Sequence, residues 1–250
     1  MSWCDKLAST PTVGMQFNHH FASSGSILDA LTPILDKLVD SKKAIFSINQ
    51  QDSFGLQLTT EDGFQYLINT TSISVGFVHR LKLKNQSAGY PTVEMISKPQ
   101  PFTALLPVVS DRLVEVAALI IEPRSRSLQQ IGIVTSTMVD EGEAPPGILK
   151  FIKYVTKPWK SGLDAYGFQI VSQLGQHPGG YDRCIHDVAK PEDGDDLATL
   201  KFDWQRKFDT RTPISSSERL TTLLANAQKD ALRYFEELAE GNRFDVDSNG

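Results

Sequence analysis

Three side chains that can bind a metal or act in nucleophilic catalysis alternate within HPGGYDRCIHD, residues 177–187. If this segment is a strand, Asp182, Cys184 and His186 point to one face of a sheet. A thiolate, an imidazole and a carboxylate on one face form either a zinc-binding group or the core of a cysteine–histidine hydrolase. No second Cys-x-x-Cys or His-x-x-x-His motif completes such a site, so we favour the alternative of a buried cysteine beside a surface histidine.

Basic residues concentrate in two segments. HRLKLK, residues 79–84, alternates basic residues with leucines, as on one face of a strand. LKFIKYVTKPWK, residues 149–160, places lysines at helical spacing beside Tyr154 and Trp159. Together these segments would offer phosphates or an acidic partner a surface with rings for stacking, and the alternative is a solvated helix face and a lysine-protected edge strand. The predicted binding residues are Arg80, Lys82, Lys84, Lys150, Lys153 and Lys157.

Two acidic clusters could bind a divalent cation, but we favour the alternative of solvated loop charges. Acidic residues gather at 140–143 and 192–196, in loops with Pro or Gly where solvated charges are usual. The sequence has no Walker loop, no dinucleotide-binding Gly-x-Gly-x-x-Gly and no Gly-x-Ser-x-Gly motif. We therefore expect neither a bound metal nor a cofactor.

The composition is that of a globular protein with a mildly acidic surface. The 250 residues are 40% hydrophobic and 22% charged, with a formal net charge of −5, which leaves room for a local basic surface only. Cys4 and Cys184 are the only cysteines, which argues against a disulfide framework and favours a reducing compartment. Because no apolar run has the length of a signal peptide or a membrane span, we expect a cytoplasmic protein without a membrane partner.

The first half of the chain has the pattern of a strand, a helix and a meander. Residues 12–18 alternate as a strand, and residues 27–40 carry the apolar stripe of an amphipathic helix. Short turns between the strands that follow predict antiparallel neighbours. These four strands are predicted at residues 43–50, 54–60, 64–70 and 73–84.

The second half adds strands and two helices. LVEVAALIIE, residues 113–122, is apolar on both faces and predicts a central, covered strand, with residues 128–139 as its hairpin partner. A last helix runs from a capping box of Ser215 and Glu218 to Gly241, which closes it in the left-handed conformation. Between these lie a predicted helix at 148–158, opened by Pro145 and Pro146, and strands at 165–174, 181–188 and 197–209.

These elements predict an α+β protein with a mostly antiparallel, curved sheet and a long C-terminal helix packed on it. Residues 12–84 and 128–209 share the order strand, helix and meander, which is consistent with a duplicated unit. We expect either one continuous domain or two halves with a connection and a tail. Their ranges are 1–88 for the N-terminal half, 89–112 for a Pro-rich connection, 113–241 for the C-terminal half and 242–250 for a flexible tail.

This order of elements resembles the layout of an uncharacterised, sporadically distributed bacterial protein family of similar length. The resemblance covers most of the chain and includes FVHRLKL, residues 77–83, and LKFDWQRKFD, residues 200–209, which precedes the long helix. No catalytic motif accompanies it. The patchy distribution of that family implies an accessory of a mobile element or of phage defence.

Taken together, the patterns favour a non-enzymatic binding protein in a cytoplasmic complex, with another protein or a second copy of the chain as its partner. Nucleic-acid binding through the basic residues is the first alternative. A metal-dependent or Cys/His-dependent hydrolase centred on residues 177–187 is the second. A helix lying against a curved sheet would also enclose a pocket for a small molecule.

Overall fold

The computed structural model describes most of the chain. The described residues are 4–5, 10–21, 32, 36, 46–51, 55–79, 81–84, 92–95, 100–140, 143–159, 163–192 and 197–243, with the backbone alone for 46–51, 81–84, 92–95 and 210. The helix predicted at 27–40 lies outside these residues, apart from positions 32 and 36.

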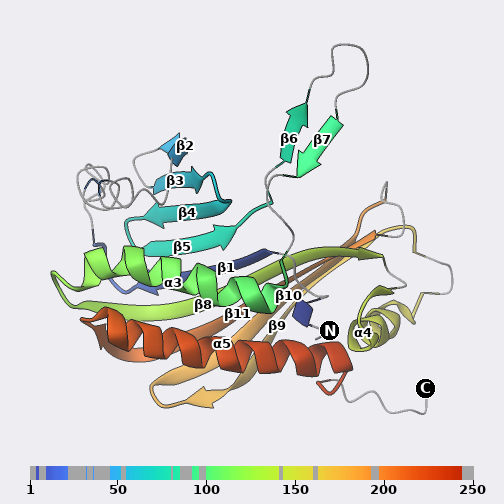
Figure 1. Ribbon diagram of the computed structural model, residues 1–250. Coiled ribbons are helices and arrows are strands. Elements are labelled where there is room, and N and C mark those ends of the chain that lie inside the picture. The colour runs from blue at the N-terminus through green and yellow to red at the C-terminus, as the bar shows by residue number, and fades with distance from the viewer. Residues whose placement is uncertain are drawn as a thin grey trace.

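Most strands belong to a single sheet (Figure 1). They are β1 (Thr10–Phe17), β2 (Phe46–Gln51), β3 (Gly55–Thr60), β4 (Phe64–Asn69), β5 (Ser72–Phe77), β8 (Arg126–Asp140), β9 (Tyr166–His177), β10 (Gly180–Lys190) and β11 (Leu197–Ile214). Within the described residues these nine strands pair antiparallel in the order β2-β3-β4-β5-β1-β8-β11-β10-β9. A separate hairpin, β6 (Leu81–Lys84) with β7 (Thr92–Met95), stands away from the sheet, so the strand predicted at 73–84 divides after Phe77.

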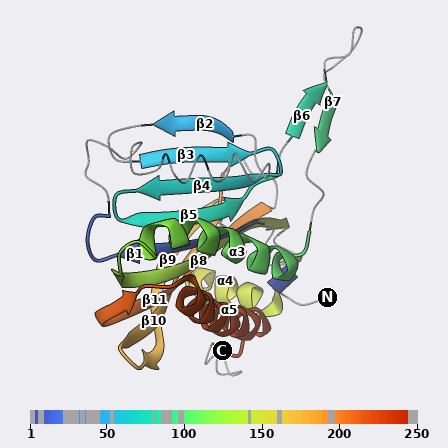
Figure 2. The ribbon, with the colours of Figure 1, turned by 60° about the vertical axis from the view of Figure 1, so that its left-hand side comes forward.

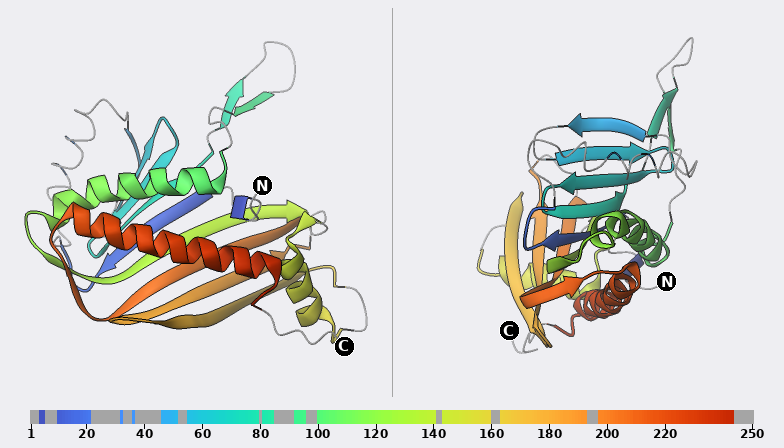
Figure 3. Two further views of the ribbon diagram at one scale, coloured as in Figure 1. Left: turned by 60° about the horizontal axis from the view of Figure 1, so that its bottom comes forward. Right: turned by 90° about the vertical axis from the view of Figure 1, so that its left-hand side faces the viewer.

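Two long helices lie side by side across one face of the sheet (Figure 3). They are α3 (Phe102–Ile121) and α5 (Ser217–Glu240). Phe102 packs edge-on against Phe235, with 6.3 Å between ring centroids, while Glu122 at the other end of α3 accepts a hydrogen bond from Ser217. The two helices are therefore antiparallel. The α+β class, with the C-terminal helix on an antiparallel sheet, is confirmed.

The prediction of a strand at 113–122 is wrong, because these residues form the second half of α3. Buried positions recur along this helix with the helical period, from Leu106 and Val109 to Leu113, Val116 and Ala117. The ten-residue window hid that period, since its apolar residues also fill both faces of a strand. Consequently β8 is not a hairpin partner of this segment, and it pairs instead with β1 and β11.

The last helix begins one residue later than its predicted capping box. The N-cap is Ser216, whose hydroxyl accepts a hydrogen bond from the amide of Arg219, and not Ser215. Gly241 closes the other end with φ of 85°, as predicted. The third helix, α4 (Pro146–Thr156), packs beside this end, where a Cβ on Gly147 would collide with the carbonyl oxygen of Leu238.

The two halves of the sheet follow the same path (Figure 2). In one half β1 lies beside β5, followed outward by β4, β3 and β2, and in the other β8 lies beside β11, followed by β10 and β9. The first strands of the halves pair antiparallel, with Val13 opposite Ile133, so a two-fold rotation between them exchanges the halves in topology. Among the described residues the second half has no counterpart of β2.

No helix within the described ranges is long and apolar enough to cross a membrane.

Candidate ligand-binding cavity

Strand β10 carries the three residues that the sequence singled out on the face covered by α5. Asp182, Cys184 and His186 alternate there, opposite Arg206, Trp204 and Phe202 of β11. The prediction that these three side chains share one face agrees with this register. Their environments differ, however, and of the three only His186 belongs to the lining of the cavity between β9, β10, α4 and α5.

Asp182 is held in an ion-pair network that joins two strands to α5. The guanidinium of Arg206 donates two hydrogen bonds to its carboxylate, at 2.9 and 2.8 Å, and a further one of 2.7 Å to Asp230 on the helix. The guanidinium of Arg206 also lies over the ring of Trp204, 5.2 Å from the ring centroid, which is within the range of a cation–π contact. The Asp182 carboxylate therefore has a structural role, since it holds the arginine that links α5 to the sheet through Asp230.

Cys184 is fully buried, and its thiol donates a long hydrogen bond of 3.7 Å to the carbonyl oxygen of Ile185. Burial, followed by the nearby charge of Asp203, raises the pKa of the thiol far above its ordinary value. A reactive cysteine requires the opposite shift, because the thiolate is the nucleophile. Both ring nitrogens of His186 are bonded to other groups, so this histidine is not placed to accept the thiol proton.

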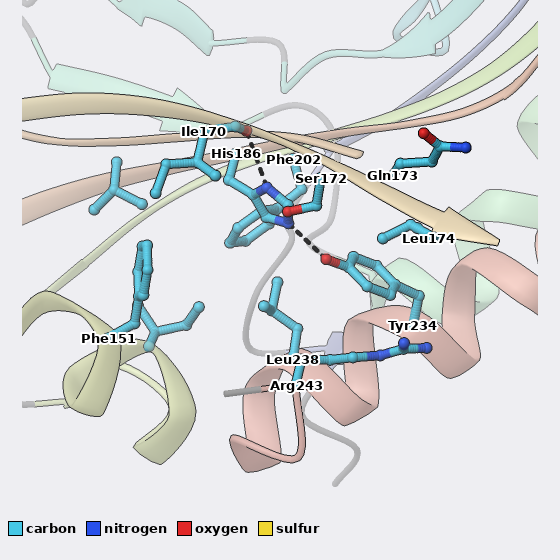
Figure 4. Close-up of a pocket in the computed structure, with 12 residues that line it drawn as sticks. Phe151, Ile170, Ser172, Gln173, Leu174, His186, Phe202, Tyr234, Leu238 and Arg243 are labelled. Atoms are coloured by element: carbon cyan, nitrogen blue, oxygen red, sulfur yellow. Dashed lines mark hydrogen bonds between the residues drawn. The ribbon is translucent and has the colours of Figure 1, made fainter. Parts of the chain in front are cut away.

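His186 and Tyr234 form a buried hydrogen-bonded pair between β10 and α5 (Figure 4). Nδ1 of His186 lies 3.1 Å from the carbonyl oxygen of Ile170, and Nε2 lies 2.7 Å from the hydroxyl of Tyr234. Because a carbonyl only accepts, Nδ1 carries the proton and Nε2 accepts from Tyr234. Burial lowers the pKa of His186 and raises that of Tyr234, so both side chains are neutral at neutral pH.

A cavity of about 310 Å³ opens beside this pair, between β9, β10, α4 and α5. Its volume is at the lower end of the range of small-molecule sites. Figure 4 shows Ser172 next to the imidazole, with Phe151 and Leu238 on the helix side. The lining is mainly apolar and consists of Ile148, Phe151, Ile170, Ser172, Gln173, Leu174, His186, Val188, Phe202, Tyr234, Leu238 and Arg243.

Arg243 supplies the cationic group of the cavity. Its guanidinium lies 5.0 Å from the ring centroid of Tyr234 and forms an ion pair of 2.5 Å with Glu237. The carboxylate balances the arginine charge, so the site as a whole does not present a net positive charge to a ligand. The arrangement thus combines apolar walls with a neutral hydrogen-bonding group.

The basic residues predicted to act together lie on two separate elements. Lys150 and Lys153 of α4, with Lys157 just after it, are exposed, as are the rings of Tyr154 and Trp159 at 62% and 65%. Lys82 and Lys84 lie on β6, where only the backbone is described, and Arg80 lies outside the described residues. Figures 1 and 3 show the β6–β7 hairpin away from α4, so the structure does not bring the two segments together.

The sequence indicated His186 but not the residues that complete its site. Tyr234 and Arg243 lie 48 and 57 positions further along the chain, and only the packing of α5 on β10 brings them close. One signal was present, since Tyr234 directly precedes Phe235 on the apolar stripe of α5. A tyrosine on a buried stripe usually requires a hydrogen-bond partner.

Metal-ligand clusters of three or more His, Cys, Asp or Glu side chains do not occur in the part of the chain that the structure describes. Comparison with known proteins finds no matching family model, no matching curated protein and no matching solved structure.

Proposed function

We propose that this protein is a non-enzymatic binding protein that holds a small amphiphilic molecule in the cavity between β9, β10, α4 and α5. The observation that carries the proposal is the neutral His186–Tyr234 pair set in an apolar cavity. Such a pair can hydrogen-bond a polar group of a ligand while the walls bury its apolar part.

The chemistry of the lining defines the ligand. Phe151, Phe202 and Leu238 favour an alkyl chain or a ring, and the Tyr234 oxygen and Ser172 hydroxyl favour an uncharged polar head. A charged head would have to be desolvated beside two neutral groups and an arginine whose charge Glu237 already balances, which is unfavourable. The cavity has the volume of roughly ten water molecules at about 30 Å³ each, which suits a small ligand.

Isothermal titration with two matched probes, nonanol and nonanoate, tests this proposal. We expect nonanol to bind, and nonanoate to bind about tenfold more weakly, because the ordinary cost of desolvating a carboxylate is large. Equal or stronger binding of nonanoate would disprove the assignment of a neutral head. Failure of both probes to bind would disprove the cavity as their site.

Two variants locate the binding site. Ser172→Phe puts a ring into the cavity from the edge strand β9 and should abolish nonanol binding. Ala225→Phe puts the same ring on the exposed side of α5 and should leave binding unchanged. A titration in which both variants bind like the parent protein would contradict the proposed location.

A second candidate function is supported by the outer face of α4. Lys150, Lys153 and Lys157 are exposed there beside Tyr154 and Trp159, which is a combination suited to phosphates and stacked bases. Lys153→Glu should weaken binding of a single-stranded oligonucleotide and reduce its salt dependence, whereas Lys229→Glu on the exposed side of α5 should not. Indifference of binding to salt and to Lys153→Glu would remove this candidate.

Membership of a larger cytoplasmic complex, and the role in phage defence implied by the resemblance in layout, remain predictions. Purification of the protein with its native partners tests both.

A further inference from the structure

Strand β9 forms one edge of the sheet (Figure 3) and lacks the features that usually protect a long edge strand from further pairing. Tyr166–His177 spans 12 residues and contains no Lys, Arg, Asp, Glu or Pro. Its one described strand neighbour is β10, so the other edge offers backbone groups for pairing. Edge strands are normally protected by charges, prolines or short length, because an open edge recruits further strands.

The symmetry of the sheet points to the same edge. Rotation about the axis between β1 and β8 exchanges β5 with β11, β4 with β10 and β3 with β9. In the first half β2 follows β3, whereas no described strand follows β9 in the second half. A strand added beside β9 would complete the match between the halves.

Five alternating exposed positions of β9 read the same in both directions. They are Gly167, Gln169, Val171, Gln173 and Gly175, and Gln176, which follows them, is exposed as well. An antiparallel pair centred on Val171 would set valine against valine, glutamine against glutamine and glycine against glycine. The register shift between β9 and β10 lies near Leu174, so the residues from Gln169 to Gln173 pair regularly.

We propose that β9 pairs antiparallel with β9 of a second copy of this chain, about a two-fold axis at Val171. Antiparallel pairing of identical strands gives a closed two-fold dimer, in which each copy offers the same surface. The two sheets join into one continuous sheet through this contact.

The inward face of β9 supports a second copy as the occupant. On that face the same pairing sets Phe168 against Leu174 and Ile170 against Ser172, so apolar residues meet apolar or small ones. No charged side chain on the strand faces its own copy, which avoids the repulsion that like charges opposite each other cause. This inference is independent of the proposed ligand, although Ile170, Ser172 and Leu174 also line the cavity.

Disulfide cross-linking tests the position of the axis. Directly opposed residues in an antiparallel pair have Cβ atoms about 4.5 to 5.5 Å apart, so Val171→Cys should form a covalent dimer on mild oxidation. Gln169→Cys is a matched control. In the proposed pair each residue 169 lies opposite Gln173 of the other copy, so the two introduced cysteines are too far apart to form a disulfide. The native thiols Cys4 and Cys184 are buried and do not interfere. Equal cross-linking of both variants would overturn this register.

Sedimentation equilibrium tests the dimer itself. The parent protein and Val171→Thr should dimerise, whereas Val171→Lys should raise the dimer dissociation constant about tenfold or more, because it opposes two like charges. Val171 is 56% exposed, so neither change should affect folding, which circular dichroism checks. The proposal would be overturned if the protein were a monomer at every concentration or if Val171→Lys left the dimer unaffected. It would also be overturned if this edge paired only with a strand of a different protein.

Discussion

At the scale of single residues, burial decides the protonation of the groups around the cavity. His186 exchanges water for the Ile170 carbonyl and the Tyr234 hydroxyl, and burial keeps both His186 and Tyr234 neutral. The pair therefore acts as a fixed hydrogen-bonding group and not as an acid or base near neutral pH. A ligand must place its polar group within hydrogen-bonding distance of this pair, because it has to make up for the hydrogen bonds to water that it displaces.

The lowered pKa of His186 predicts a pH dependence of stability. Because burial holds the folded pKa below the ordinary value of 6.5, the unfolded chain protonates His186 at a higher pH than the folded chain does. The stability contribution is complete above the unfolded pKa and is lost as the pH falls toward the folded pKa. Urea unfolding at about pH 7.5 and about pH 5.5 should show a smaller acid-induced loss for His186→Gln than for the parent protein. An equal loss in both proteins would contradict the buried, neutral histidine.

Arg206 and Arg233 provide a matched pair for testing the ion-pair network. Both donate to Asp230, but the side chain of Arg206 is 10% exposed and that of Arg233 is 65% exposed. Arg206→Met should lower the free energy of unfolding by about 3 kcal/mol, since it leaves Asp182 without its bidentate partner. Arg233→Met should cost less than about 1 kcal/mol. Similar losses in the two variants, measured by urea unfolding, would show that the network is not a buried one.

At the scale of elements, start and stop signals determine where α5 lies. Ser216 and Gly241 fix a helix of 24 residues that spans the sheet and carries Tyr234 to β10. Its position is maintained at the far end by the close approach of Gly147 on α4 to Gly241. The caps therefore help to shape the helical side of the cavity, which β9 and β10 line on the other side.

The N-cap assignment has a direct test in two adjacent serines. Ser216→Ala removes the hydroxyl that accepts from the Arg219 amide and should lower the free energy of unfolding by about 1 kcal/mol. Ser215→Ala should have little effect, because Ser215 precedes the cap. Thermal unfolding of the two variants distinguishes them, and a larger loss in Ser215→Ala would restore the capping box first predicted from the sequence.

Elements with a clear period could be predicted from the sequence, and ambiguous ones could not. The strands β9, β10 and β11 and the helices α4 and α5 alternate or recur regularly, and their predicted ranges overlap the observed ones. Residues 113–122 failed because a buried helix that is apolar on several sides resembles a covered strand in a short window. Extending the window back to Phe102 would have revealed the helical period.

At the scale of the whole molecule, the long central strands join the two halves into one sheet. β8 pairs with β1 on one side and with β11 on the other, so the hydrogen-bonded sheet continues from one half into the other without a break. α3 and α5 bridge the halves again through the Phe102–Phe235 contact. The cavity lies in the second half, where β9, β10, α4 and α5 line it.

This continuity predicts a single cooperative unfolding transition. Separation of β1 from β8 would expose both strands and part of each long helix, so the halves should not melt independently. Differential scanning calorimetry should give equal calorimetric and van't Hoff enthalpies per cooperative unit. Two resolved transitions would contradict it.

The candidate site was only partly accessible from the sequence, because strand alternation fixes faces but not partners. It placed Asp182, Cys184 and His186 on one face, and could not show that Arg206 holds the first and Tyr234 the last. Those contacts depend on the crossing of α5 over β10. Long-range packing of this kind leaves no spacing signal in the chain.

The imidazole of His186 provides the most direct measurement of whether the cavity binds a ligand. The ¹⁵N resonances of its two ring nitrogens, followed during addition of nonanol, should shift as the ligand contacts the pair, while those of His177, in the β9–β10 turn region, stay constant. Saturation of the His186 shift alone is the predicted result. If calorimetry shows that nonanol is bound and the His186 resonances do not change, the ligand lies elsewhere and the proposed binding site is wrong.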